Sequence, residues 1–131
     1  MKFTVWGENG CLSALFDHKW IKEEQVLVFL ITIEVDHQNI YLSSTLFRKD
    51  LLIFRRDLLS LYENPTGSLD LAFHGQSLTM NAVRNPLGHI HWNVSVELRG
   101  EIDLSPKFSL RADRTYLPDL IDQINVILES T

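Results

Sequence analysis

Residues 113–128, DRTYLPDLIDQINVIL, decide the fold class of this 131-residue chain. Apolar residues recur through the stretch at helical spacing, and the polar residues between them fall on the opposite side of one helix. Pro118 is tolerated only in the first turn of a helix, so the helix begins between Thr115 and Leu117. Asp113 or Thr115 caps it with a side-chain oxygen. The apolar stripe consists of Leu117, Leu120, Ile121, Ile124, Ile127 and Leu128.

A helix with one such apolar side needs a sheet or a second helix to cover it. Strands are predicted between residues 69 and 112, because apolar and polar residues alternate through four segments that turns at 74–77, 85–88 and 100–106 connect. Consecutive strands with short links form an antiparallel meander. Its apolar side takes the helices, and its polar side faces water. The inward positions are Leu69, Leu71, Phe73, Leu78, Met80, Ala82, Ile90, Trp92, Val94, Val96, Leu98, Phe108, Leu110 and Ala112.

The N-terminal part of the chain predicts further strands. Residues 2–16 read as a hairpin around an Asn9–Gly10 turn, and residues 17–25 as a charged connection. Residues 26–35 are nearly all apolar and rich in β-branched side chains, which indicates a strand covered on both faces. A polar turn then leads into a strand over residues 40–46.

A second helix is predicted over residues 50–63, with Asp50 as its N-cap and the breaker residues 64–67, NPTG, at its end. No repeat or linker divides the chain. Residues 1–131 are therefore predicted to form a single α+β domain: a twisted, mostly antiparallel β-sheet (a meander) with two α-helices packed on one face. The apolar stripe of this helix consists of Leu51, Phe54, Leu58 and Leu61, with Leu52, Leu59 and Tyr62 beside them.

Composition and charge exclude several classes of protein. Hydrophobic residues at 45% and charged residues at 22% are ordinary values for a globular protein, which excludes disorder. The formal net charge of −5 argues against nonspecific nucleic-acid binding, which needs a basic surface. The longest apolar run is far shorter than the roughly 20 residues of a membrane helix. A single cysteine and a polar N-terminus without a signal-peptide pattern predict a cytoplasmic protein.

His89 and His91 are the first candidates for chemistry. Residues two apart on a strand share a face, so both imidazoles could bind one metal ion, and His74 could add a third ligand. However, no cysteine or carboxylate stands at ligand spacing, and the motifs HExxH and CxxC do not occur. A protein that binds a metal or a small ligand through His89 and His91 is therefore an alternative reading, and no cofactor is predicted.

Catalytic patterns do not emerge from the sequence. Cys11 stands at the start of a strand, where a small, half-buried thiol is the common outcome. No GxSxG elbow and no glycine-rich phosphate loop occur. The carboxylate pairs Glu23–Glu24 and Asp119 with Asp122 lie on segments that are expected to be solvated. The sequence therefore predicts a protein that is not an enzyme.

The three tryptophans divide between core and surface. Trp92 falls on the apolar side of its strand and is predicted to be in the core. Trp6 and Trp20 would be natural anchors of a protein interface if they are exposed, whereas the alternative is that they cover the edge of the sheet.

The second half of the chain contains four distinctive segments: DLLIFRRDLLSLY at 50–62, GHIHWNVSV at 88–96, FSLRAD at 108–113 and DRTYLPDLIDQI at 113–124. Together they resemble the wall-associated-toxin immunity (WapI-like) family of bacterial proteins. The resemblance covers residues 48–128. It implies a cytoplasmic protein without enzymatic activity that binds and neutralises a cognate toxin, and it brings no catalytic motif with it.

We therefore expect an immunity-like binding protein that occludes a protein toxin with a preformed polar surface. A third reading is a structural protein that forms homo-oligomers through the open sheet face or an uncovered edge strand. No nucleic-acid or membrane partner is expected. The predicted partner-binding residues are His89, His91, Asn93 and Glu97 on the sheet, with Asp119 and Asp122 on the last helix as second choice.

Overall fold

A computed structural model describes residues 1–21, 23–75, 77–98 and 104–131, and of residues 18–21 the backbone alone. Within these ranges no helix is long and apolar enough to cross a lipid bilayer. The elements are β1 (Lys2–Gly7), β2 (Gly10–Ile21), β3 (Val26–Val35), β4 (Gln38–Phe47), α1 (Arg48–Glu63), β5 (Gly67–Gly75), β6 (Leu78–Arg84), β7 (His89–Val96), β8 (Lys107–Asp113), the 3₁₀ turn η1 (Arg114–Tyr116) and α2 (Leu117–Glu129).

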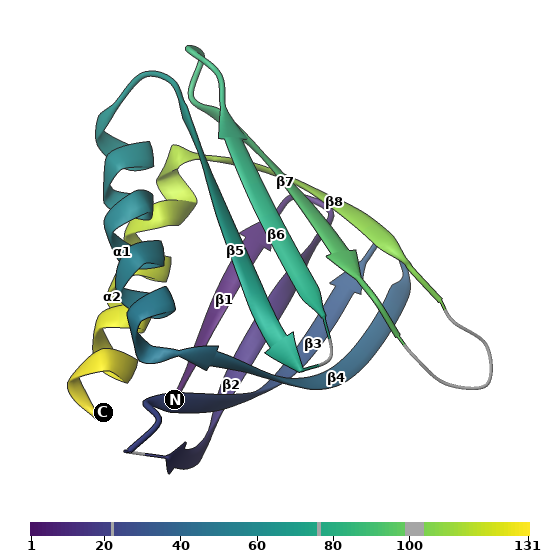
Figure 1. The fold of residues 1–131 in the computed structure, drawn as a ribbon. Coiled ribbons are helices and arrows are strands. Elements are labelled where there is room, and N and C mark those ends of the chain that lie inside the picture. The colour runs from purple at the N-terminus through teal and green to yellow at the C-terminus, as the bar shows by residue number, and fades with distance from the viewer. Residues whose placement is uncertain (22, 76, 99–103) are drawn as a thin grey trace.

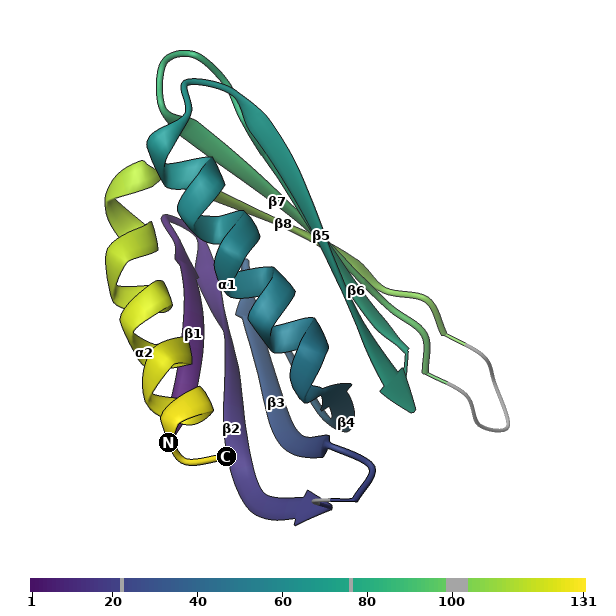
Figure 2. The ribbon, with the colours of Figure 1, turned by 60° about the vertical axis from the view of Figure 1, so that its left-hand side comes forward.

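The eight strands form one antiparallel sheet whose spatial order is the order of the sequence, β1 to β8. This confirms the predicted α+β meander with two helices. Figures 1 and 2 show that the sheet folds over, so that β1–β4 and β5–β8 form two halves with the helices along one side. The halves are joined by a short pairing of β4 with β5, at Ser44–Gly75 and Thr45–His74.

The turn between β1 and β2 brings the first strand against the last. The amide of Asn9 donates to the carbonyl oxygen of Ser109 at 2.7 Å and accepts from the N–H of Arg111 at 3.1 Å. The N–H of Glu8 donates to the carbonyl of Arg111 at 2.7 Å. Gly7 permits this approach, because a Cβ at that position would lie 3.0 Å from the carbonyl oxygen of Arg111. The curled sheet is thus closed at one end.

The inner face of the folded sheet carries the core that the alternating pattern predicted. Ile90, Trp92 and Val94 are each 1% exposed, and the inward residues of β5, β6 and β8 are buried as well. The polar residues between them lie on the outer face, as predicted. Arg99, which the same alternation assigns to that face, lies outside the described residues. Leu98 is only partly buried and follows the end of β7, where it pairs with Leu104.

Helix α1 packs inside the fold and contacts both halves of the sheet. The ring of Phe54 lies 6.1 Å from that of Phe3 on β1 and 6.3 Å from that of Trp92 on β7, measured between centroids. Helix α2 packs beside α1, and Arg55 donates to the side-chain oxygen of Asn125 between them. The predicted stripe of α2 is buried, and so are Leu51, Phe54, Leu58 and Leu61 of α1. The flanking positions of the α1 stripe are not: Leu52 is only partly buried, and Leu59 and Tyr62 are 40% and 37% exposed. The two helices therefore close the open side of the curled sheet.

The residues that cap the two helices differ from those predicted. Helix α2 begins at Leu117 with Pro118 in its first turn, as expected. Neither Asp113 nor Thr115 caps α2 itself, whose N-cap is Tyr116 and which has no side-chain cap. Asp113 instead caps the 3₁₀ turn η1 that precedes the helix, where its carboxylate accepts from the N–H of Thr115. Asp50 is not the N-cap of α1. The helix starts earlier, after Phe47, and the carboxylate of Asp50 accepts from the N–H of Phe47 from within the first turn.

In the N-terminal half of the chain, the connections between strands differ from those predicted. Gly7 pairs with Gly10, so the hairpin turn is Glu8–Asn9 and not Asn9–Gly10. The predicted charged connection at 17–25 is wrong up to Ile21, because β2 continues past a shift in its pairing with β3. The side chain of Trp20 and part of the turn predicted at 100–106 lie outside the described residues.

Strand β3 is not covered on both faces, as its apolar run had suggested. Its inward residues are buried, but Leu30 on the outward side is 43% exposed. The helices lie on the inner face alone, so the outward residues of this strand contribute to the molecular surface.

Arg84, at the end of β6, is a buried cation at the C-terminus of α1. Its side chain is only 7% exposed, and its Nη1 donates to the carbonyl oxygens of Leu61 and Tyr62 at 2.7 and 2.8 Å. The last carbonyls of a helix lack partners within it and carry partial negative charge, which favours a cation there. Arg84 therefore joins the end of α1 to the second half of the sheet.

We expect Arg84→Met to lower the free energy of unfolding by about 1–3 kcal/mol, because the buried carbonyls of Leu61 and Tyr62 lose their donor. Chemical denaturation followed by circular dichroism measures this loss. Arg56→Met is the matched control, since the Arg56 side chain is 73% exposed and changes there have little effect. Equal stability of both variants would contradict the role of Arg84.

Candidate functional site

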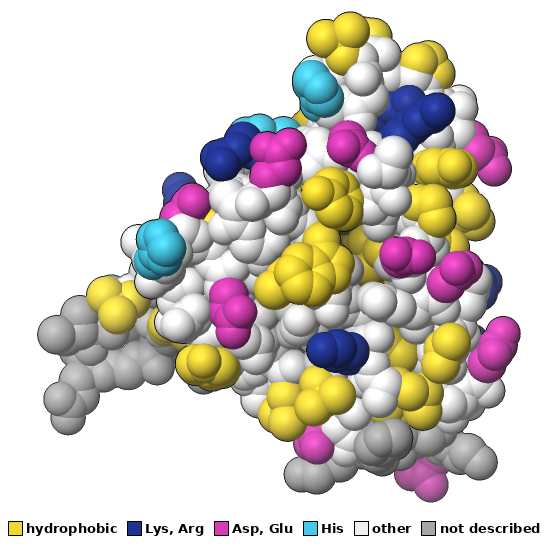
Figure 3. Space-filling view, turned by 180° about the vertical axis from the view of Figure 1, so that it is seen from behind, with side chains coloured by type: hydrophobic (Ala, Val, Ile, Leu, Met, Phe, Trp, Pro, Cys, Tyr) yellow, Lys and Arg dark blue, Asp and Glu magenta, His cyan; other side chains and the backbone are white. Residues whose placement is uncertain are grey.

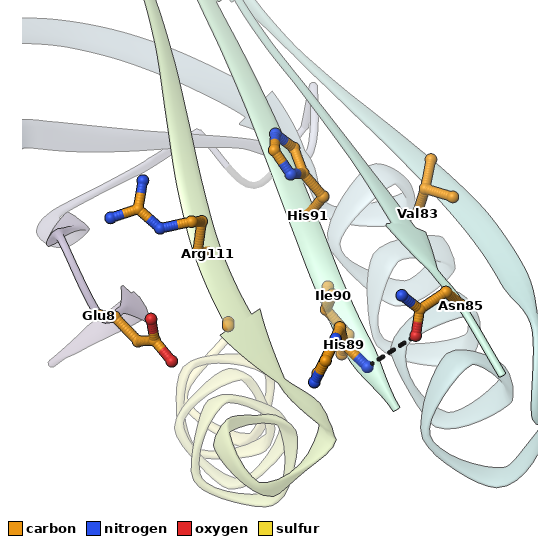
Figure 4. A pocket seen from close by; sticks show the side chains of 8 residues that line it. Glu8, Val83, Asn85, His89, Ile90, His91 and Arg111 are labelled. Carbon is orange, nitrogen blue, oxygen red and sulfur yellow. Dashed lines mark hydrogen bonds between the residues drawn. The ribbon is translucent and has the colours of Figure 1, made fainter. Parts of the chain in front are cut away.

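A cleft of about 420 Å³ opens on the outer surface where β6, β7 and β8 meet the β1–β2 turn. Figure 4 shows Glu8 and Arg111 on one side of His89, and Val83 and Asn85 on the other. The cleft is lined by Glu8, Val83, Asn85, His89, Ile90, His91, Arg111 and Ala112.

Strand register places the charged side chains of the cleft side by side. His91 pairs with Arg111 across β7 and β8, and His89 pairs with Asp113. Cross-strand partners point to the same face, so the imidazole of His91 and the guanidinium of Arg111 are neighbours on the outer surface. Glu8 also lies beside them, although β1 and β8 are the first and last strands of the sheet, because the hydrogen bonds of Asn9 hold the β1–β2 turn against β8.

Asn85 shapes the turn that leads into β7. Its side-chain oxygen accepts from the N–H groups of Leu87 and His89 at 3.0 and 3.1 Å, and its backbone carbonyl accepts from Gly88. Gly88 adopts a φ of 86°, in the left-handed region that glycine tolerates best. The start of β7, and with it His89, is therefore held by a hydrogen-bonded turn.

The cleft presents charges of both signs that are available to a partner. Within the described part of the chain, neither Glu8 nor Arg111 forms an ion pair, although both line the cleft. His89 and His91 are exposed. Hydrogen bonds from the hydroxyl and the N–H of Thr115 lower the pKa of the Asp113 carboxyl, and the nearby His89 lowers it further. Such a cleft can bind an acidic side chain at Arg111 and a basic one at Glu8.

Asn93, two residues after His91 on β7, lines a neighbouring groove. Its Nδ2 donates to Asn81 at 3.1 Å, and its Oδ1 accepts from Ser109 at 3.4 Å, which forms a polar ladder across β6, β7 and β8. The groove beside it has a volume of about 410 Å³ and also includes Asp70 and Thr79. His89, His91 and Asn93 thus share one polar surface.

The other predicted site residues lie apart from the cleft. Glu97 follows the end of β7 opposite to His89, and its N–H donates to the carbonyl oxygen of Ser77 at 2.9 Å. Asp119 and Asp122 are exposed on α2. The structure therefore brings together the sheet residues at one end of β7, but it does not gather all six predicted residues into one site.

His74 does not join the other two histidines. It lies at the end of β5 that pairs with β4, where its Nε2 is 3.4 Å from the carboxylate of Asp50. Among the residues that the structure describes, no three histidine, cysteine, aspartate or glutamate side chains lie close enough together to hold a metal ion.

The model of the immunity protein WapI-like family matches residues 8–131, which include both helices, the cleft and the polar ladder. The match confirms the resemblance found in the second half of the sequence and extends it through most of the first half. No curated protein matches the chain in sequence.

The cap at Asp113 makes stability depend on pH. A lowered carboxyl pKa in the folded state means that the ionised carboxyl stabilises the fold above its ordinary pKa, and that this contribution is lost as the pH falls through the folded-state pKa. We therefore expect Asp113→Ala to be less stable than the natural chain at neutral pH, with a difference that shrinks in acid. Thermal melts across the acid range measure it, and a difference that stays constant would contradict the cap.

Proposed function

The chain belongs to the immunity protein WapI-like family, and from that premise we propose that it binds a cognate protein toxin and neutralises it. The observation that carries this proposal is the extent of the match, residues 8–131, which takes in nearly the whole fold and not an isolated motif. The protein acts by binding and not by catalysis. It performs this role in the cytoplasm, where its single free thiol, Cys11, is kept reduced.

Occlusion is the mechanism that the surface favours. The outer face of β6–β8 consists of side chains on a continuous antiparallel sheet, which offers a preformed surface that needs little rearrangement on binding. His89, His91 and Asn93 supply hydrogen-bonding groups on that face, and the cleft supplies charges of both signs. A toxin seated there has its working surface covered by this protein.

Arg111 and Glu8 give this contact its specificity. A guanidinium recognises a carboxylate with two parallel hydrogen bonds, and Glu8 selects a basic group next to it. A partner that presents a basic and an acidic side chain in this arrangement satisfies both charges. A partner with the opposite arrangement places like charges together, which costs affinity.

Co-expression with the protein encoded by the adjacent upstream reading frame tests the proposed function. We expect that protein to arrest growth when expressed alone, and this chain to restore growth and form a stable complex with it after purification. A harmless neighbour, or a toxic one that forms no complex, would contradict the proposal.

The contribution of the cleft is tested separately with the double variant His89→Ser, His91→Ser. We expect its affinity for the toxin to fall about tenfold or more, because both exposed imidazoles leave the contact surface. Isothermal titration calorimetry measures the dissociation constant. His74→Ser is the matched control, since His74 is exposed at the opposite end of the sheet. Equal binding by the double variant and the control would remove the cleft from the interface.

A further inference from the structure

The outer face of β1–β4 carries large apolar side chains that the helices do not cover. Trp6 is 53% exposed, Tyr41 70%, and Leu15 and Leu30 43% each. We call these four residues the Trp6 patch. Figure 3, which views this face, shows hydrophobic side chains gathered at its centre. Exposed apolar clusters of this kind on a folded protein mark interaction sites more often than isolated apolar residues do.

Strand pairing places the four residues of the Trp6 patch on one face of the sheet, with Tyr41 in the row between Trp6 and Leu15. Leu15 pairs with Leu30 across β2 and β3, so these two side chains are direct neighbours. Trp6 pairs with Cys11 across β1 and β2, at the other end of the same face. The positions between them carry hydroxyl groups, and those of Thr4 and Ser13 lie 3.2 Å apart. Tryptophan and tyrosine are among the residue types that are enriched in binding hot spots.

Acidic residues predominate around the patch and form its border. Asp17 follows Leu15 by two residues on the outward side of β2, and Glu34 pairs with Cys11, whereas Lys2, which pairs with Leu15, is a basic residue on the same face. Helix α2 borders the other side, because the side-chain oxygen of Gln123 accepts from the N–H of Thr4 at 2.8 Å and holds the helix along the β1 edge. That helix carries the exposed Asp119 and Asp122. Figure 3 shows more acidic than basic side chains on this face, in agreement with 17 acidic and 12 basic residues in the chain.

The Trp6 patch adjoins the cleft at the closed end of the sheet. Glu8, which lines the cleft, is only two residues from Trp6 and lies in the turn that Asn9 holds against β8. A partner seated over the closed end of the sheet can therefore contact the cleft and the patch together.

We propose that the Trp6 patch is the main docking surface for the toxin, and that the toxin meets it with a surface that is apolar at its centre and basic at its rim. This inference rests on the proposed function and names the partner's chemistry. Trp6 is the anchor at the end of the patch nearest the cleft, and the surrounding carboxylates attract the basic rim and speed its approach. The acidic border disfavours a second copy of this chain, because like charges would face each other across the interface.

The variant Trp6→Ala tests the anchor. We expect the dissociation constant for the protein encoded by the adjacent reading frame to rise about 30-fold or more, the effect of removing an interface hot spot. Association should also slow as the salt concentration rises, because salt screens the attraction between the acidic border and a basic rim. Tyr62→Ala is the matched control, an exposed aromatic residue on α1. Circular dichroism establishes that both variants are folded.

Alkylation of Cys11 gives a second measurement that needs no substitution. Burial raises the pKa of this thiol, and the charge of Glu34 raises it further, so the reaction with N-ethylmaleimide is followed at mildly alkaline pH. Cys11 is partly exposed next to Trp6. We expect the bound toxin to slow its alkylation at least tenfold.

Three outcomes overturn the inference. If the natural chain binds its neighbour but Trp6→Ala binds equally well and Cys11 reacts at the same rate in the complex, the patch is not the docking surface and the proposed function stands. If alkylation slows with rising concentration of this chain alone, the patch pairs with a second copy. If the natural chain binds no neighbouring toxin, the proposed function fails and this inference fails with it.

Discussion

The contact of Phe54 with rings from two distant strands is the interaction on which the rest of the structure depends. A sheet of eight antiparallel strands could remain open, but its inner face is apolar along its whole length and must be covered. Helix α1 provides that cover between the two halves, with Phe54 against Phe3 on β1 and Trp92 on β7. Because one helix serves both halves, the sheet folds around it, and α2 closes the remaining side. One continuous core results.

This arrangement decides which surfaces remain for a partner. The helices occupy the inner face, so the whole outer face of the sheet is left to water or to another protein. At its closed end, Asn9 joins the β1–β2 turn to β8 and thereby places Glu8 next to Arg111 and the histidines of β7. The cleft on the outer face of β6–β8 and the Trp6 patch on the outer face of β1–β4 are therefore neighbours at the β1–β2 turn. In our proposal the toxin covers both.

Local pattern was sufficient to predict the helices and the inward side of most strands. The alternation around Trp92 and the stripe around Leu120 each report burial directly, because the period of the apolar residues identifies the buried face. The closure of the sheet was not predictable in this way, since it depends on contacts between Asn9 and residues about a hundred positions away. For the same reason the pattern placed His89 and His91 on one exposed face but missed Glu8 as their neighbour. The apolar run of β3 was misread as doubly covered, because Leu30 belongs to an exposed patch.

The central claim, that α1 holds both halves of the sheet in one fold, is tested most directly by hydrogen exchange on the variant Phe54→Ala. Removal of a buried phenylalanine typically costs about 3–5 kcal/mol of stability. We expect the amides of β1–β4 and of β5–β8 to lose protection together and by similar amounts. Ile53→Ala, at the neighbouring position that is 42% exposed, should leave protection nearly unchanged. Loss of protection confined to α1, or to one half of the sheet, would contradict the claim.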